Sequence, residues 1–154
     1  AVAAQAPARV TTLVLVDPAG NFAGMDPEQL EAYAASVEGP GGAEVLRDAY
    51  GANLERARLP TRAAVLSSLL ATPRPVVAAG YRAIFAADPA DLARRYGGPV
   101  TLVTDEANSS PWSLAAQHPE LRAYAMPEVS HWLPLDDPDG FCAILDAVLG
   151  PPTH

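Results

Sequence analysis

Three short runs rich in branched apolar residues, separated by helical patterns, constrain the fold most. The first run, Val10 to Val16, is almost continuously apolar and ends at the turn-forming residues 17–20 (DPAG). The other two runs span residues 99–104 and 121–126. A near-continuous apolar run is typical of a parallel strand that is covered on both faces. The order strand, helices, strand, helix, strand, helix therefore predicts an α/β fold with about three parallel strands and flanking helices, joined by right-handed crossovers.

Between the first two strands, the pattern from residue 25 to about residue 87 is helical. Asp26, Pro27 and Glu28 supply an N-cap, a first-turn proline and an acidic residue, which together mark the start of a helix. The glycine-rich residues 39–42 end that helix. Three further helical segments are expected around residues 43–58, 65–70 and 76–85. Four helices are more than a simple crossover needs, so this stretch is expected to be an insertion.

The remaining helices complete one expected domain over residues 1–154. A helix opens at Asp88-Pro89 and ends at Gly97-Gly98, just before the second strand. The last helix carries a single apolar stripe, made of Phe141, Ile144, Leu145, Val148 and Leu149. We expect residues 10–24 and 88–150 to form the core and residues 25–87 to form the helical insertion.

Composition excludes several classes of protein. The chain has 154 residues, 49% of them hydrophobic, which is enough to bury a core. Its net charge of -8 repels phosphate backbones and anionic lipids, so we expect neither nucleic acid nor membrane as a partner. The single cysteine, Cys142, excludes an internal disulfide and a cysteine metal site, and we expect it to pack in the core. We predict a soluble chain, with the cytoplasm favoured, and neither metal nor cofactor.

The segment 128–135 (EVSHWLPL) follows the third strand and precedes a helix opened by Asp137-Pro138. This arrangement resembles the histidine turn of the α/β-hydrolase family. Residues 9–20 (RVTTLVLVDPAG) resemble the family's sixth strand, and residues 87–104 resemble the approach to its seventh strand. The resemblance runs from about Arg9 to Leu149 and covers the C-terminal half of the family's fold, which implies a partial α/β-hydrolase fold.

The resemblance implies two further features. In the family, an insertion at residues 25–87 is a lid, or cap, over the active site; a helical subdomain that only packs is the other interpretation. The nucleophile lies on a strained elbow with the pattern G-x-S-x-G. The sequence contains no such pattern. Six serines lack this elbow and are not expected to be nucleophiles: Ser67, Ser68, Ser109, Ser110, Ser113 and Ser130.

His131 is the candidate general base, and it needs a carboxylate on its far ring nitrogen. We rank Asp105 first, Asp17 second and Glu106 third as that acid. Asn108 falls where the family's acid lies, which is a departure, because an amide cannot offset the charge of an imidazolium. Asp17 is also read as an ordinary turn-former before proline. Two further histidines, His118 and His154, lack metal-ligand spacing.

Two functions follow from these observations. The favoured one is a truncated or split hydrolase-like protein that is inactive alone and forms a homodimer through the exposed edge of its first strand. The alternative is the C-terminal half of a carboxylic-ester hydrolase that acts on a small apolar ester. Its nucleophile and oxyanion hole would then come from a complementary hydrolase half. The absent elbow and the amide at Asn108 favour the first.

Overall fold

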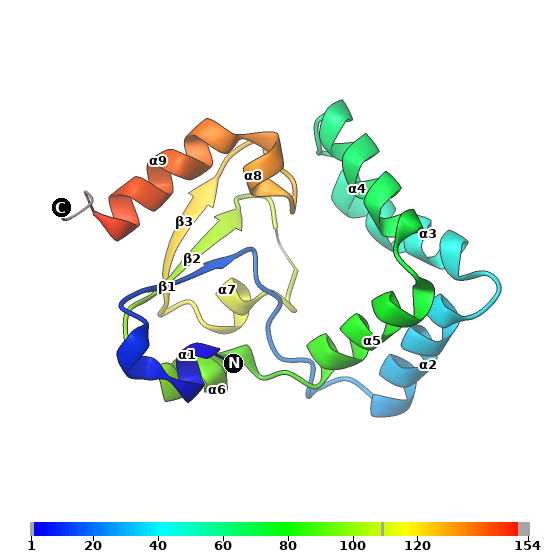
Figure 1. The fold of residues 1–154 in the computed structure, drawn as a ribbon, viewed down its shortest axis with the longest axis horizontal. Coiled ribbons are helices and arrows are strands. Elements are labelled where there is room, and N and C mark those ends of the chain that lie inside the picture. Colours follow the sequence, from blue (N-terminus) through cyan, green and yellow to red (C-terminus); the bar gives the residue numbers. More distant parts are fainter. Residues whose placement is uncertain (1, 109, 151–154) are drawn as a thin grey trace. The chain divides into compact units, whose positions relative to one another are not determined.

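The computed structural model describes residues 2–108 and 110–150, which form two compact units. The first unit contains the described residues of Ala1–Asn21 and Asp88–His154, and the second is Phe22–Ala87. The strands of the described chain lie in the first unit, whereas the second unit is built from helices (Figure 1). Each unit has its own apolar core.

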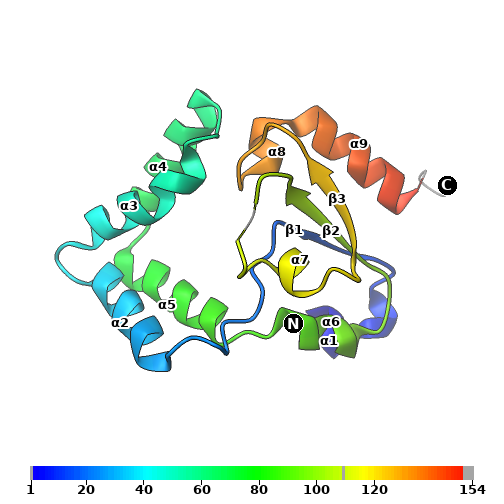
Figure 2. The same cartoon turned by 180° about the vertical axis from the view of Figure 1, so that it is seen from behind.

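Three parallel strands form the sheet of the first unit. They are β1 (Leu13–Val16), β2 (Val100–Asp105) and β3 (Arg122–Met126), in the spatial order β1-β2-β3 (Figures 1 and 2). The predicted α/β fold with three parallel strands is confirmed. The first strand is shorter than expected, because a 3-10 turn at Pro7–Arg9 precedes it and pairing with β2 begins only at Leu13.

Helices flank this sheet before, between and after the strands. They are α1 (Val2–Gln5), α6 (Pro89–Tyr96), α7 (Leu114–Gln117), α8 (Leu133–Asp136) and α9 (Pro138–Leu149). The predicted ends of α6 are confirmed: the side chain of Asp88 accepts a hydrogen bond from the Asp91 N–H, and Gly97 ends the helix with φ 68°. Only a residue that tolerates a left-handed backbone fits that last position easily.

The two faces of the sheet carry separate apolar clusters, because successive side chains of β2 point to opposite sides. On one face Val103 packs with Met126, Val129 and Leu133, and α9 adds Phe141 and Ile144. On the other face Leu102 packs with Ala90 of α6 and Leu114 of α7. Both β2 side chains are fully buried. Helices therefore cover both faces, as the near-continuous apolar strand predicts.

Cys142 is exposed on α9, so the expectation that it packs in the core is wrong. The helical period explains the difference. Phe141 and Ile144 face the sheet, and the residue next to Phe141 points about 100° away around the helix. A single apolar residue beside an apolar stripe is therefore not always part of it.

The second unit consists of four helices, as the sequence pattern predicts. They are α2 (Pro27–Glu38), α3 (Gly42–Leu54), α4 (Leu59–Ala71) and α5 (Arg74–Phe85). Val37, Leu46 and Ala78 form the centre of its core. Tyr33 and Tyr81 pack edge to face beside them, and burial raises the pKa of the Tyr81 phenol. Arg82 forms ion pairs with Glu31 and Glu38, and its hydrogen bond lowers the pKa of Glu31.

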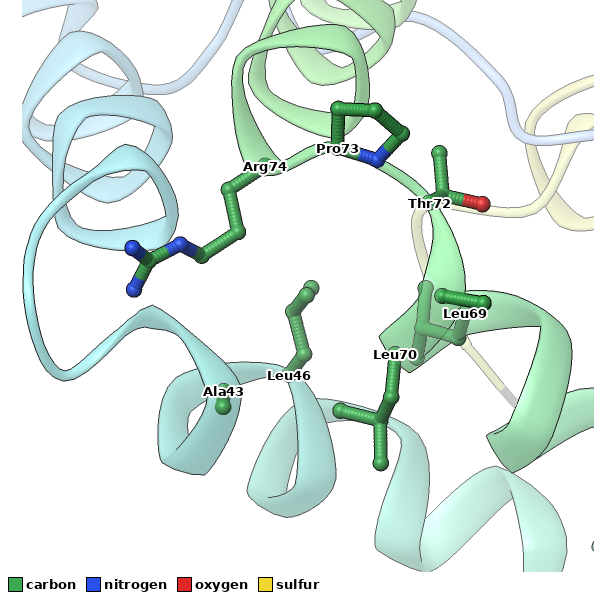
Figure 3. A pocket seen from close by; sticks show the side chains of 8 residues that line it. Ala43, Leu46, Leu69, Leu70, Thr72, Pro73 and Arg74 are labelled. Carbon is green, nitrogen blue, oxygen red and sulfur yellow. The ribbon is translucent and has the colours of Figure 1, made fainter.

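The helical unit also contains small pockets. One has a volume of about 310 Å³ and lies among α3, the end of α4 and the start of α5; its lining includes Leu46, Leu70 and Arg74 (Figure 3). The Arg74 guanidinium donates to the carbonyl oxygens of Gly39 and Pro40, so its hydrogen bonds lie on the loop before α3. A second pocket, of about 270 Å³, is lined mainly by apolar side chains.

No single helix of the described chain is long and apolar enough to cross a membrane. The pair α4 and α5 reaches the required length and hydropathy only together, with a bend of 104° between the two helices.

Replacing Leu102 with alanine should lower the free energy of unfolding by roughly 2–5 kcal/mol, because it leaves a cavity at the centre of the sheet. Trp112 and Trp132 both lie in the first unit, so urea unfolding followed by tryptophan fluorescence reports on this unit. Leu135→Ala is the control, because that side chain is 56% exposed. Equal losses in both variants would contradict the placement of Leu102 in the core.

Candidate active site

Asp17 follows β1 directly and is held in an unusual backbone conformation. Its φ is 40°, in the left-handed region, and its backbone N–H donates to the Val103 carbonyl oxygen at 2.7 Å. Aspartate tolerates this region better than most residues. The carboxylate is 2% exposed. A strained, buried acid at a strand end is a feature that functional sites share.

The turn after β3 positions His131. Glu128, with φ 55°, redirects the chain, and Val129 anchors the turn in the core. Ser130 and Asp136 are fully buried. The Asp136 carboxylate accepts hydrogen bonds from the Ser130 N–H at 2.8 Å and from its hydroxyl at 2.5 Å. This Ser130–Asp136 brace ties the turn to α8 and fixes the backbone on which His131 stands.

His131 and Asp17 meet at the carboxyl ends of β1 and β3. The imidazole Nδ1 lies 2.6 Å from Asp17 Oδ2. The histidine side chain is 47% exposed, and Trp132 packs edge to face against its ring at 5.3 Å between centroids. With Nδ1 on the carboxylate, Nε2 is the nitrogen left for a substrate or a nucleophile. This is the arrangement by which an acid orients a histidine base and stabilises its protonated form.

The turn after β2 contributes an amide to the same place. Asn108 Nδ2 donates to Asp17 Oδ1 at 2.9 Å. Asp105 is buried, and its Oδ1 accepts from the Ala107 N–H at 2.9 Å, which closes the turn. The Glu106 side chain is exposed, and its N–H donates to the Met126 carbonyl oxygen. Of the three acids ranked from the sequence, Asp17 is the one that the structure pairs with His131.

Several serines in the described chain have structural partners. Ser113 caps α7 by accepting from the Ala116 N–H, and the Ser110 hydroxyl accepts from the Trp112 N–H. Ser130 is bound to Asp136. Ser67 and Ser68 lie within α4, and Ser109 is outside the described residues. The observed partners of Ser110, Ser113 and Ser130 stabilise turns and a helix end.

The described residues include no group of three or more His, Cys, Asp and Glu side chains that could hold a metal ion. His118 pairs with Glu120, at 2.9 Å from Nδ1 to Oε1. Hydrogen bonds from its own backbone and from His118 lower the pKa of the Glu120 carboxyl. His154 lies outside the described residues.

Comparison with known proteins supports the fold. No protein-family model matches the chain. No curated protein matches it in sequence. A solved structure is similar: MGS-M2, an alpha/beta hydrolase enzyme from a Medee basin deep-sea metagenome library, with a TM-score of 0.61 and 13% sequence identity. The match covers 99% of this chain and 60% of that one. The chain therefore has an α/β fold that matches part of an α/β hydrolase.

Replacing Asp136 with alanine should lower the free energy of unfolding of the first unit by at least about 2 kcal/mol. The change leaves two buried Ser130 donors without their acceptor, and each such group costs about 1–3 kcal/mol. Urea unfolding followed by tryptophan fluorescence measures the loss. Asp139→Ala, an exposed acid in the first turn of α9, is the matched control. A variant as stable as that control would rule out the brace.

Proposed function

We propose that this chain supplies the acid and the general base of a carboxylic-ester hydrolase. The observation that carries the proposal is the contact of His131 with the buried carboxylate of Asp17. A serine nucleophile and an oxyanion hole would come from a segment outside these 154 residues, because the sequence holds no G-x-S-x-G pattern. The fold shared with part of MGS-M2 is consistent with this division.

In the proposed reaction, His131 Nε2 accepts the proton of the serine hydroxyl as the serine oxygen attacks the ester carbonyl carbon. Asp17 stabilises the imidazolium that forms. The imidazolium then returns the proton to the leaving alcohol as the carbon–oxygen bond breaks. In the second half, water attacks the acyl carbon and gives its proton to Nε2. The imidazolium then gives that proton to the serine oxygen as the acyl–serine bond breaks, and the acid product leaves. Asp17 keeps Nδ1 protonated throughout, so that Nε2 is the basic nitrogen.

The second candidate is a self-associating protein without catalysis. Its support is the sheet order, in which β1 pairs with β2 and forms one edge of the described sheet. Leu13 and Asp17 donate their N–H groups towards β2, at Pro99 and Val103. By the alternation of a strand, the N–H groups of Val14 and Val16 point the other way. An uncharged apolar edge such as this is a template for another strand.

The helical segment 25–87 is proposed as the lid of the hydrolase. A pocket of about 270 Å³ in the helical unit, lined by Phe22, Leu30 and Phe85 among others, lies just below the usual range of about 300–1,000 Å³ for ligand pockets and suits a short apolar acyl chain. Replacing residues 25–87 with a short linker should leave hydrolysis of an acetyl ester intact and remove any preference for short over long acyl chains. An unchanged chain-length preference would count against this role.

The acid–base proposal predicts a measurable reaction of the chain alone with p-nitrophenyl acetate. An oriented imidazole attacks this activated ester at the carbonyl carbon, releases p-nitrophenolate, and the acyl-imidazole is then hydrolysed to acetate. We expect His131→Ala to reduce the rate to that of buffer. Asp17→Asn should lower it at least about tenfold, because the amide neither holds the tautomer nor offsets the charge.

His118→Ala is the matched control for this reaction, because His118 also pairs with an acid but lies outside the candidate site. Its rate should equal that of the unchanged chain. Equal rates for the unchanged chain and His131→Ala would contradict the acid–base proposal. The non-catalytic candidate would then remain.

The self-association proposal predicts a particle of twice the 16.0 kDa chain mass in light scattering on a size-exclusion column. Val16→Pro should convert it to a monomer. Proline removes an N–H that points away from β2, so pairing within the sheet is kept while the outer edge loses a donor. A chain that is already monomeric, or a Val16→Pro chain that stays dimeric, would exclude association through this edge.

A further inference from the structure

Asp17 is buried without an ion-pairing lysine or arginine among the described residues. Its carboxylate has one oxygen on His131 Nδ1, at 2.6 Å, and the other on Asn108 Nδ2, at 2.9 Å. At 2% exposure, the carboxylate has lost nearly all contact with water. A buried carboxylate needs hydrogen-bond donors to remain in place. Asn108 supplies the donor for Asp17 Oδ1, and His131 supplies the donor for Oδ2.

The orientation of the Asn108 amide is fixed from both ends. Its Oδ1 accepts from the Ser110 N–H at 3.1 Å, so Nδ2 is the end that faces Asp17. The Asn108 backbone N–H donates to the Asp105 carbonyl oxygen at 3.1 Å, which closes the turn beneath it. Because both neighbours require the same assignment of oxygen and nitrogen, the amide acts as a donor towards the acid.

We propose that Asn108 is a positioning residue that holds the Asp17 carboxylate in the orientation that fixes the tautomer and direction of His131. Without the amide, the carboxylate can rotate about its terminal bond, and Oδ2 is no longer fixed on Nδ1. An aspartate at position 108 would place a second carboxylate against the first, and the two would repel. An amide supplies a donor here that a carboxylate lacks.

The consequence of losing Asn108 concerns His131 rather than the fold. Nδ1 carries the proton only while a fixed acceptor lies opposite it. When that acceptor moves, a second tautomer with its proton on Nε2 gains population, and this tautomer offers no base towards a nucleophile. The Asn108 amide therefore acts on Nε2 through two hydrogen bonds, without contact to a substrate.

The test measures the tautomer of His131 directly, by the ¹⁵N chemical shifts of both ring nitrogens in chain labelled at histidine. The unchanged chain should show a single tautomer with the proton on Nδ1. Asn108→Ala and Asn108→Asp should each show a mixture. Ser110→Ala is the matched control, because it removes a hydroxyl from the same turn and keeps the backbone N–H that binds the Asn108 amide.

A second readout is the His131-dependent rate with p-nitrophenyl acetate, which rests on the proposed function. Asn108→Ala should lower it roughly tenfold, comparable to the loss of a partner that orients a metal-bound histidine. Two results would overturn the positioning role. One is a His131 tautomer population that is the same in both Asn108 variants as in the wild-type chain, and the other is a mixture of tautomers already present in the wild-type chain. If the tautomer responds but no His131-dependent rate exists, the positioning role stands and the proposed hydrolase function fails.

Discussion

One buried carboxylate ties together the ends of all three strands. Asp17 follows β1, Asn108 lies in the turn after β2, and His131 lies in the turn after β3. Two hydrogen bonds, at 2.9 and 2.6 Å, join the amide and the imidazole to opposite oxygens of the acid. The turns that carry these residues are separated by up to 114 positions in the chain. Their common meeting point depends on the sheet being parallel, because only then do all three strands end at the same edge.

Two residues with left-handed backbone conformations lie next to the buried contact of Asp17 with His131. The left-handed conformation of Asp17 turns its side chain inward at the end of β1, and Glu128 redirects the chain ahead of His131 in a similar way. The brace from Asp136 to Ser130 then holds the histidine turn from below. Such local costs persist only where the surrounding structure supports them. Here the support comes from the packed core. The Asp17 N–H donates to the Val103 carbonyl oxygen, Val129 and Leu133 lie two residues either side of His131, and all three apolar side chains belong to one buried cluster.

The Asn108 amide is interpreted differently from the sequence and from the structure. Along the chain, it occupies the place where the resembling family has an acid, and there it counts against a complete triad. In the fold, it donates to an acid from the neighbouring strand. From the sequence, Asp105 of the turn after β2 ranked ahead of Asp17 of the turn after β1. In the structure both turns contribute to the site. Because β1 and β2 are paired, Asn108 of the turn after β2 lies within hydrogen-bond distance of Asp17 after β1.

Local sequence patterns predict the three parallel strands, the four-helix insertion and the segment that carries His131. These features follow from local patterns of apolar residues, prolines and helix caps, which act over a few residues. The exposure of Cys142 and the choice of Asp17 beside His131 were decided by the tertiary structure. A helix period turns neighbouring residues to different sides, and an acid finds its histidine only when strands far apart in sequence are brought into register. Side-chain contacts at that distance depend on the packed sheet, so no local pattern contains them.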